Sequence, residues 1–144
     1  MAKTPKDDLT NGPGTTLEFN ADLFRSLQNL DVRLVLSHRG AEHRITPESR
    51  VMLIGRSDEC DLIVSHPFAS RIHARVVYRL GKFVLIDQSK NGTYIRPEGS
   101  EEVCLNEQEE YPLVGTGEVG LGQPVDAAGD EVIQYRLEQG ERGS

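Results

Sequence analysis

Short apolar runs, each ended by a turn-forming residue, constrain the fold of this chain more than any other feature of its sequence. Residues 62–64 and 83–86 are apolar runs too short for helices, and in residues 72–80 every second side chain is apolar, which is the period of a half-buried strand. Gly, Pro or Asn lies between most of the runs. Many short strands at such spacing predict an all-β fold, either an antiparallel sandwich or a barrel. The expected strands are residues 31–36, 42–46, 51–54, 62–64, 72–80, 82–87, 94–95, 103–105, 119–121 and 132–137.

The length and composition fit one domain with a real core. The chain has 144 residues, of which 37 % are hydrophobic, and no apolar run approaches the length of a membrane span. The first residues lack the apolar stretch of a secretory signal, so we expect a cytoplasmic protein. Its two cysteines, Cys60 and Cys104, are too few for a disulfide framework and have no metal-type spacing.

The two ends of the chain differ from its middle. Residues 1–30 are expected to be a flexible tail with a possible short helix, in which Asn20 is the N-cap. Residues 31–138 are expected to form the domain, and residues 139–144 to fray. The apolar face of that helix would consist of Leu23, Phe24, Leu27 and Leu30.

Charge is spread unevenly along the chain. The net charge is −7, yet residues 31–97 carry eleven basic and seven acidic side chains, and residues 98–144 carry two basic and twelve acidic ones. This balance argues against general nucleic-acid binding, which needs a basic surface. A small anionic ligand would instead find its charge partner in the middle of the chain. The acidic run at residues 98–110 is expected to be a solvated loop. The alternative is that it forms a surface for a partner.

Three short signatures in the middle of the chain combine turn residues with side chains that bind anions. They are Gly55-Arg56-Ser57, Ser70-Arg71-Ile72-His73-Ala74 and Asp87-Gln88-Ser89-Lys90-Asn91-Gly92-Thr93. A guanidinium group meets phosphate oxygens two at a time, and serine hydroxyls can donate to the same oxygens. An Asn-Gly pair favours a tight turn, because both residues tolerate positive φ. The signatures therefore predict phosphate recognition by loops that follow strands.

Together the three signatures resemble the forkhead-associated (FHA) domain in their order and spacing, over roughly residues 31–138. The resemblance implies a two-sheet antiparallel β-sandwich of about eleven strands, with recognition loops at one end. It also implies binding of phosphothreonine peptides without catalysis, without a cofactor and without a metal ion, in signalling downstream of a Ser/Thr protein kinase.

The resemblance also implies roles for single residues. Arg56 should pair with the phosphate, Ser70 should donate its hydroxyl to it, and Asn91 should hold the ligand backbone. Lys90 stands where the family often has Ser or Thr, and it either adds a phosphate contact or changes the side-chain preference. The implied phosphopeptide-binding residues are Arg56, Ser70, Arg71, Lys90 and Asn91. The implied loop-shaping residues are Gly55, His73, Gly92 and Thr93.

Two further resemblances concern partners. Residues 105–123 look like FHA domains appended to bacterial nucleotide cyclases, which would make this chain a detached sensing module or a fragment of a larger protein. The segment with Thr15 and Thr16 is similar to threonine-bearing tails of FHA regulators, which are phosphorylated and then bound by their own domain.

Other readings of the same residues remain. A phosphate-independent assembly domain would use the sandwich faces rather than the loops. A hydrolase would need His73 with Cys60 or Ser70, but no base, nucleophile and orienting residue form a credible set. His73 is better explained as a buried histidine with hydrogen-bond partners, and Cys60, among acidic neighbours, as a structural cysteine. Asp58, Glu59, Asp61 and His66 show no recognised metal-binding spacing.

Overall fold

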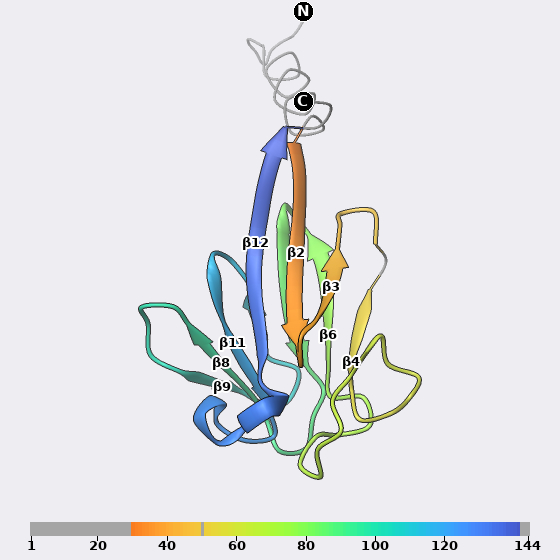
Figure 1. Cartoon of the computed structure of the whole chain (residues 1–144), viewed down its shortest axis with the longest axis vertical. Helices are drawn as coiled ribbons and strands as arrows, with labels where there is room; N and C mark the ends of the chain where they lie inside the picture. The colour runs from red at the N-terminus through yellow and green to blue at the C-terminus, as the bar shows by residue number, and fades with distance from the viewer. Residues whose placement is uncertain (1–29, 50, 142–144) are drawn as a thin grey trace, which may run out of the picture. The chain divides into compact units, whose positions relative to one another are not determined.

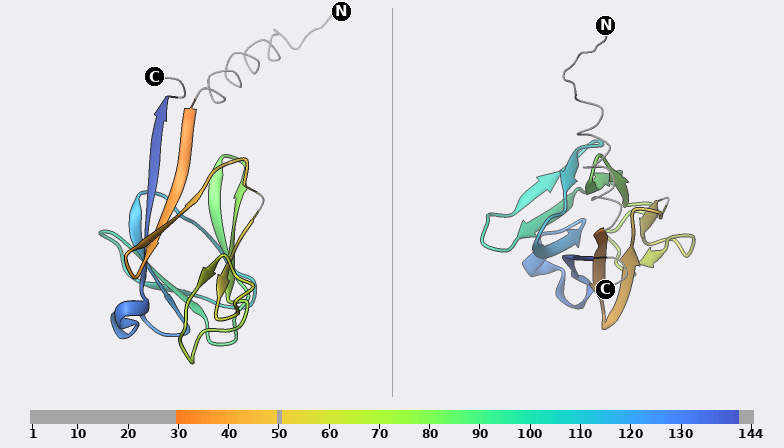
Figure 2. Two further views of the ribbon diagram at one scale, coloured as in Figure 1. Left: turned by 45° about the vertical axis from the view of Figure 1, so that its right-hand side comes forward. Right: turned by 90° about the horizontal axis from the view of Figure 1, so that it is seen from above.

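The computed structural model describes residues 30–49 and 51–141, and within them eleven strands form two sheets (Figure 1). Residues 32–138 belong to one compact unit. The left view of Figure 2 shows strands β2 (Leu30–His38) and β12 (Ile133–Glu141), in orange and blue, apart from the yellow-green strands β4 (Met52–Gly55) and β6 (Ala74–Arg79). The expected all-β sandwich of about eleven strands is confirmed.

The five-stranded sheet has the order β10-β7-β6-β4-β5. It adds β5 (Leu62–Ile63), β7 (Lys82–Asp87) and β10 (Glu110–Pro112) to the two strands named above. β5 pairs with β4 in the parallel direction, so this sheet is mixed rather than purely antiparallel.

The six-stranded sheet has the order β3-β2-β12-β11-β8-β9. Two short 3₁₀ helices, η1 (Val125–Ala127) and η2 (Gly129–Glu131), lie between its strands β11 and β12. Its other strands are β3 (Ala41–Ile45), β8 (Thr93–Pro97), β9 (Val103–Leu105) and β11 (Thr116–Leu121).

The core consists of apolar side chains from both sheets. Alternation places Leu34 and Leu36 of β2 in the same buried cluster as Ala74 and Val76 of β6. Burying a side chain of this size contributes about 1.5–3 kcal/mol, so the core stabilises the ends of the strands from which the loops emerge. In the described part of the chain, no helix is long and apolar enough to cross a membrane.

The strand after the second signature is shorter than its alternation predicts. β6 covers Ala74–Arg79, whereas Leu80 is 95 % exposed with a φ of 53° and Gly81 follows with a φ of 82°. Two successive positive φ angles form the tight turn of the β6–β7 hairpin, so Leu80 is a turn residue rather than a core residue.

β10 was not expected from the sequence. Its Pro112 fits an edge strand, where one lost backbone donor is tolerated.

Residues 1–29, with Thr15, Thr16 and most of the expected helix, lie outside the described residues. Leu30, expected on the apolar face of that helix, is instead the first residue of β2. At the other end, β12 extends to Glu141, past the expected boundary at residue 138.

Candidate functional site

Arg56 and Ser70 are neighbours, although fourteen positions separate them in the sequence. The Arg56 N–H donates to the Ser70 carbonyl at 2.9 Å, and the Ser57 N–H donates to the Arg71 carbonyl at 3.1 Å. The chain leaving β4 therefore runs alongside the 70–71 segment. The loops at residues 56–61 and 64–73 lie in the lower part of Figure 1.

Gly55 permits this close approach. A Cβ at that position would lie 2.3 Å from the Arg71 carbonyl oxygen and 2.9 Å from the His73 backbone nitrogen. Any larger residue would push the two loops apart and separate the Arg56 and Ser70 side chains.

Ser70 has a hydroxyl that is oriented and still able to donate. Its Oγ accepts a hydrogen bond from the Lys90 backbone N–H at 3.1 Å, and its own backbone N–H donates to His73 Nδ1 at 2.9 Å. Because Oγ is the acceptor in the first bond, the hydroxyl proton remains available for an anion. Ser70 thereby connects the 64–73 loop to the 88–92 loop.

His73 is fully buried, and its ring connects the 64–73 loop to the 88–92 loop. Since Nδ1 accepts from Ser70, the proton lies on Nε2, which donates to the Gly92 carbonyl at 2.8 Å. Burial lowers the pKa of His73, which favours this neutral form. The interpretation of His73 as a buried histidine with hydrogen-bond partners is confirmed, and neither ring nitrogen is left to act as a base.

The turn after β7 is held by a buried carboxylate. Asp87 Oδ1 accepts from the Ser89 hydroxyl at 2.6 Å and from the Thr93 hydroxyl at 2.7 Å. Ser89 Oγ accepts in turn from the Gly92 N–H at 2.7 Å. Asp87 is fully buried, and its Oδ2 has no hydrogen-bond partner among the described residues.

Asp87 belongs to the third sequence signature, but no role was assigned to it from the sequence. A signal was present: an acidic residue directly ends a run of four apolar residues and precedes both Ser89 and Thr93. An acid at the end of a buried strand needs local donors, and these two hydroxyls provide them.

Gly92 matches its implied role in shaping the turn. Its φ is 92°, and a Cβ there would lie 2.8 Å from Cys104 Sγ.

Asn91, just before Gly92, is exposed, and its Nδ2 donates to the Phe68 carbonyl at 3.1 Å. The Asn91 amide oxygen is left free to accept from a ligand. Phe68, whose side chain is 52 % exposed beside this contact, was also missed in the sequence.

The cations at this end have no carboxylate partners. Arg56 Nε donates to the Ala69 carbonyl at 2.9 Å, which fixes the guanidinium and leaves its terminal nitrogens free to bind an anion. Arg71 and Lys90 are exposed, and among residues 30–49 and 51–141 none of the three forms an ion pair. The structure thus brings Arg56, Ser70, Arg71, Lys90 and Asn91 to one cationic end of the sandwich.

Cys60 is buried beside the site. Its Sγ donates to the Arg71 carbonyl at 3.2 Å, and burial raises the pKa of the thiol. A protonated thiol in this position supports the loop and is a poor nucleophile. In the described part of the chain, no group of His, Cys, Asp and Glu side chains is placed to hold a metal ion.

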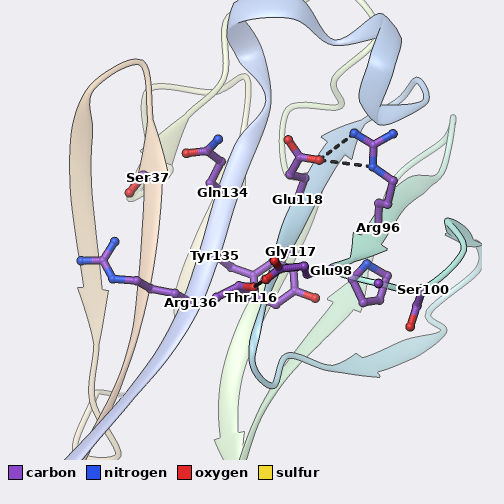
Figure 3. A pocket seen from close by; sticks show the side chains of 12 residues that line it. Ser37, Arg96, Glu98, Ser100, Thr116, Gly117, Glu118, Gln134, Tyr135 and Arg136 are labelled. Carbon is purple, nitrogen blue, oxygen red and sulfur yellow. Dashed lines mark hydrogen bonds and ion pairs between the residues drawn. The ribbon is translucent and has the colours of Figure 1, made fainter.

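A separate hollow of about 420 Å³ lies over the six-stranded sheet (Figure 3). Arg96 at its rim binds Glu118 at 2.7 Å and Asp126 at 2.9 Å, so its charge is already neutralised. None of the residues implied to bind a phosphopeptide lines this hollow. It is therefore distinct from the cationic end.

Comparison with known proteins agrees with the fold. Residues 52–111, which include all three signatures, match the sequence model of the FHA domain. No curated protein sequence matches the chain.

The solved structures that are similar to this chain include three FHA domains. The FHA-1 domain of Mycobacterium tuberculosis Rv1747 has 21 % identity and a TM-score of 0.58 over 74 % of this chain and 97 % of that one. The MEK1 FHA domain in complex with the HOP1 pThr318 peptide has 19 % identity and a TM-score of 0.57, over 73 % and 96 %. The FhaA FHA domain complexed with the intracellular domain of Rv3910 has 19 % identity and a TM-score of 0.50, over 74 % and 99 %.

Proposed function

This chain contains an FHA domain, and we propose that the domain binds phosphothreonine peptides as a signalling module downstream of a Ser/Thr protein kinase. The observation that carries the proposal is the meeting of Arg56 and Ser70, both free to donate to an anion, where no carboxylate in the described residues pairs with Arg56. The MEK1 FHA domain, which has a similar fold, was solved with a phosphothreonine peptide.

The contacts suit a phosphate monoester. Phosphothreonine carries about −1.5 to −2 charges and three strong acceptor oxygens. The terminal nitrogens of Arg56 and the Ser70 hydroxyl donate to those oxygens, while the Asn91 side chain holds the peptide backbone. Each charge-assisted bond contributes about 1.5–3 kcal/mol. Desolvation and ordering of the peptide offset much of this, so we expect micromolar binding, near −8 kcal/mol.

Two competing functions make different predictions. A phosphate-independent assembly domain would bind its partner equally well after phosphatase treatment. A hydrolase would need His73, with Cys60 or Ser70, to face a substrate. Both His73 and Cys60 are buried, and both ring nitrogens of His73 are hydrogen-bonded within the protein. The geometry therefore favours binding over catalysis.

The decisive experiment is calorimetric titration of the chain with a phosphothreonine peptide library, with phosphoserine and unmodified peptides as controls. The phosphothreonine peptides should bind, the phosphoserine peptides more weakly because they lack the methyl group, and the unmodified peptides not measurably. Arg56→Ala should abolish binding, whereas Arg39→Ala, which removes an exposed cation from the β2–β3 turn, should leave it unchanged. Equal binding of phosphorylated and unmodified peptides would overturn the proposal.

The finer partner assignments also belong to this proposal. A phosphorylated Thr15 or Thr16 in the same chain would compete for the site, so kinase treatment of the chain should weaken its binding to an added phosphopeptide. Replacing both threonines by valine should remove that effect. A place in a nucleotide-cyclase system rests on the resemblance of residues 105–123, which contain β10 and β11.

A further inference from the structure

The basic residues of this domain fall into two groups. In the described residues, six arginines form ion pairs with carboxylates: Arg33, Arg39, Arg44, Arg79, Arg96 and Arg136. Arg56, Arg71 and Lys90 do not, although the chain as a whole carries a net charge of −7. Two other described cations lack an ion pair: Arg75 within β6, opposite Ile86, and Lys82 at the start of β7, opposite Arg79. Three of the five described cations without an ion pair therefore lie in the loops at one end of the sandwich.

The backbone segments that carry these three cations meet at one residue, Ser70. The Arg56 N–H binds the Ser70 carbonyl at 2.9 Å, the Lys90 N–H binds the Ser70 Oγ at 3.1 Å, and Arg71 follows Ser70 directly. Lys90 is held through its backbone, so its long side chain is anchored at the rim of the site while its ammonium group stays free.

The number of cations exceeds what one phosphate requires. A phosphothreonine carries about −1.5 to −2 charges, which Arg56 and Arg71 together already balance. Lys90 adds a third positive charge at an exposed position. A ligand with only the phosphate would leave that charge unmatched.

The two sides of Ser70 differ in their negative charge. On the Arg71 side, the 56–61 loop carries Asp58, Glu59 and Asp61, and the Cys60 thiol experiences the charges of Glu59, Asp61 and Arg71 together. On the Lys90 side, the 88–92 loop carries Lys90 and no acidic side chain. An additional anionic group of the ligand is repelled on the first side and attracted on the second.

We propose that Lys90 selects phosphothreonine peptides that carry an acidic side chain beside the phosphothreonine, on the side of the 88–92 loop. The inference rests on the proposed function and adds the class of peptide to it. Lys90 acts as a specificity-determining residue, while Arg56 and Ser70 capture the phosphate itself.

The test uses one phosphothreonine peptide with alanine at all flanking positions and a set in which aspartate replaces one alanine at a time. Each peptide is titrated into the intact chain, into Lys90→Gln and into Lys82→Gln. Lys82 is an exposed lysine at the other end of β7, so its variant controls for the general loss of one positive charge. Lys90→Gln keeps the backbone N–H that binds Ser70 and should fold normally.

In the intact chain and in Lys82→Gln, aspartate at one flanking position should tighten binding by up to about fivefold, the upper end of the range for an exposed ion pair. Lys90→Gln should lose this gain while still binding the all-alanine phosphopeptide. A gain that persists in Lys90→Gln, or no gain at any position while the phosphopeptide still binds, would overturn the inference alone. If no phosphopeptide binds the intact chain, the proposed function fails and the inference fails with it.

Discussion

At Ser70 the backbone and the side chain have separate partners. The N–H binds His73, the carbonyl accepts from Arg56, and the hydroxyl oxygen accepts from Lys90. Within residues 30–49 and 51–141, no protein group accepts the hydroxyl proton of Ser70. A single side chain thus has its position fixed by three loop residues while its chemistry stays available to the ligand.

Ser70→Ala should therefore weaken phosphopeptide binding much more than it weakens the fold. Loss of one hydrogen bond to a charged group costs about 1.5–3 kcal/mol, which is about ten- to hundredfold in affinity. Calorimetry gives the affinity and urea unfolding gives the stability. Ser65→Ala, an exposed serine in the same loop, is the control and should change neither. Unchanged affinity in Ser70→Ala would show that the hydroxyl does not contribute to phosphate binding.

His73 makes stability depend on pH. Burial lowers its pKa in the folded protein below the ordinary value of 6.5. Below about pH 6.5 the unfolded chain therefore binds a proton that the folded protein does not, and stability falls as the pH drops toward the folded-state pKa. Urea unfolding between about pH 7.5 and about pH 5 should show this loss, and His73→Gln, although less stable, should show a smaller slope. Equal slopes in the two proteins would mean that His73 does not titrate on unfolding.

At the scale of the elements, Asp87 at the end of β7 holds the 88–92 loop in position. Its carboxylate holds Ser89 and Thr93, and Ser89 holds Gly92. Asp87 is fully buried, so it acts on the ligand only through the shape of the turn that carries Lys90 and Asn91.

Asp87→Ala should loosen this turn and reduce phosphopeptide affinity, although every residue that touches the ligand is retained. It leaves two hydroxyl groups without their acceptor, at a cost in stability of about 1–3 kcal/mol. Asp87→Asn keeps an acceptor oxygen for both hydroxyls and should restore most of the affinity. Titration and urea unfolding of both variants check this. Full affinity in Asp87→Ala would show that the turn holds its shape without the carboxylate.

The sequence predicted the strands whose side chains alternate and the loops whose residues carry distinctive chemistry. β4 and β7 were expected within a residue of their observed bounds, because apolar runs and turn residues mark both ends. β10 was missed, since Glu110-Tyr111-Pro112 has no apolar run and becomes a strand only by pairing with β7. Leu80 was misassigned because an apolar residue in a tight turn has the same local pattern as a strand residue.

The same division holds for the site. Arg56, Ser70 and Asn91 could be selected because their side chains and spacing are unusual together. The contacts among them could not be predicted, because they are backbone hydrogen bonds between distant loops and leave no sequence pattern. The roles of Phe68 and Asp87 were missed for the same reason, as their importance depends on which loop packs against them.

At the scale of the whole described domain, the loop end and the outer surface of the six-stranded sheet differ in their free charge. The loop end carries cations without partners, whereas the hollow on the six-stranded sheet carries Arg96 already paired with Glu118 and Asp126 (Figure 3). A phosphopeptide gains little from a cation whose charge is already neutralised. We therefore propose that the phosphate binds at Arg56 and Ser70 and not at the hollow.

Two-dimensional NMR of the intact chain during titration with a phosphothreonine peptide tests this location most directly. The largest signal changes should occur at Arg56, Ser70, Lys90 and Asn91, with no comparable change at Arg96, Glu118 or Gln134 around the hollow. The unmodified peptide should cause none of these changes. Changes centred on the hollow, or changes at the loops that are the same with the unmodified peptide, would contradict the account.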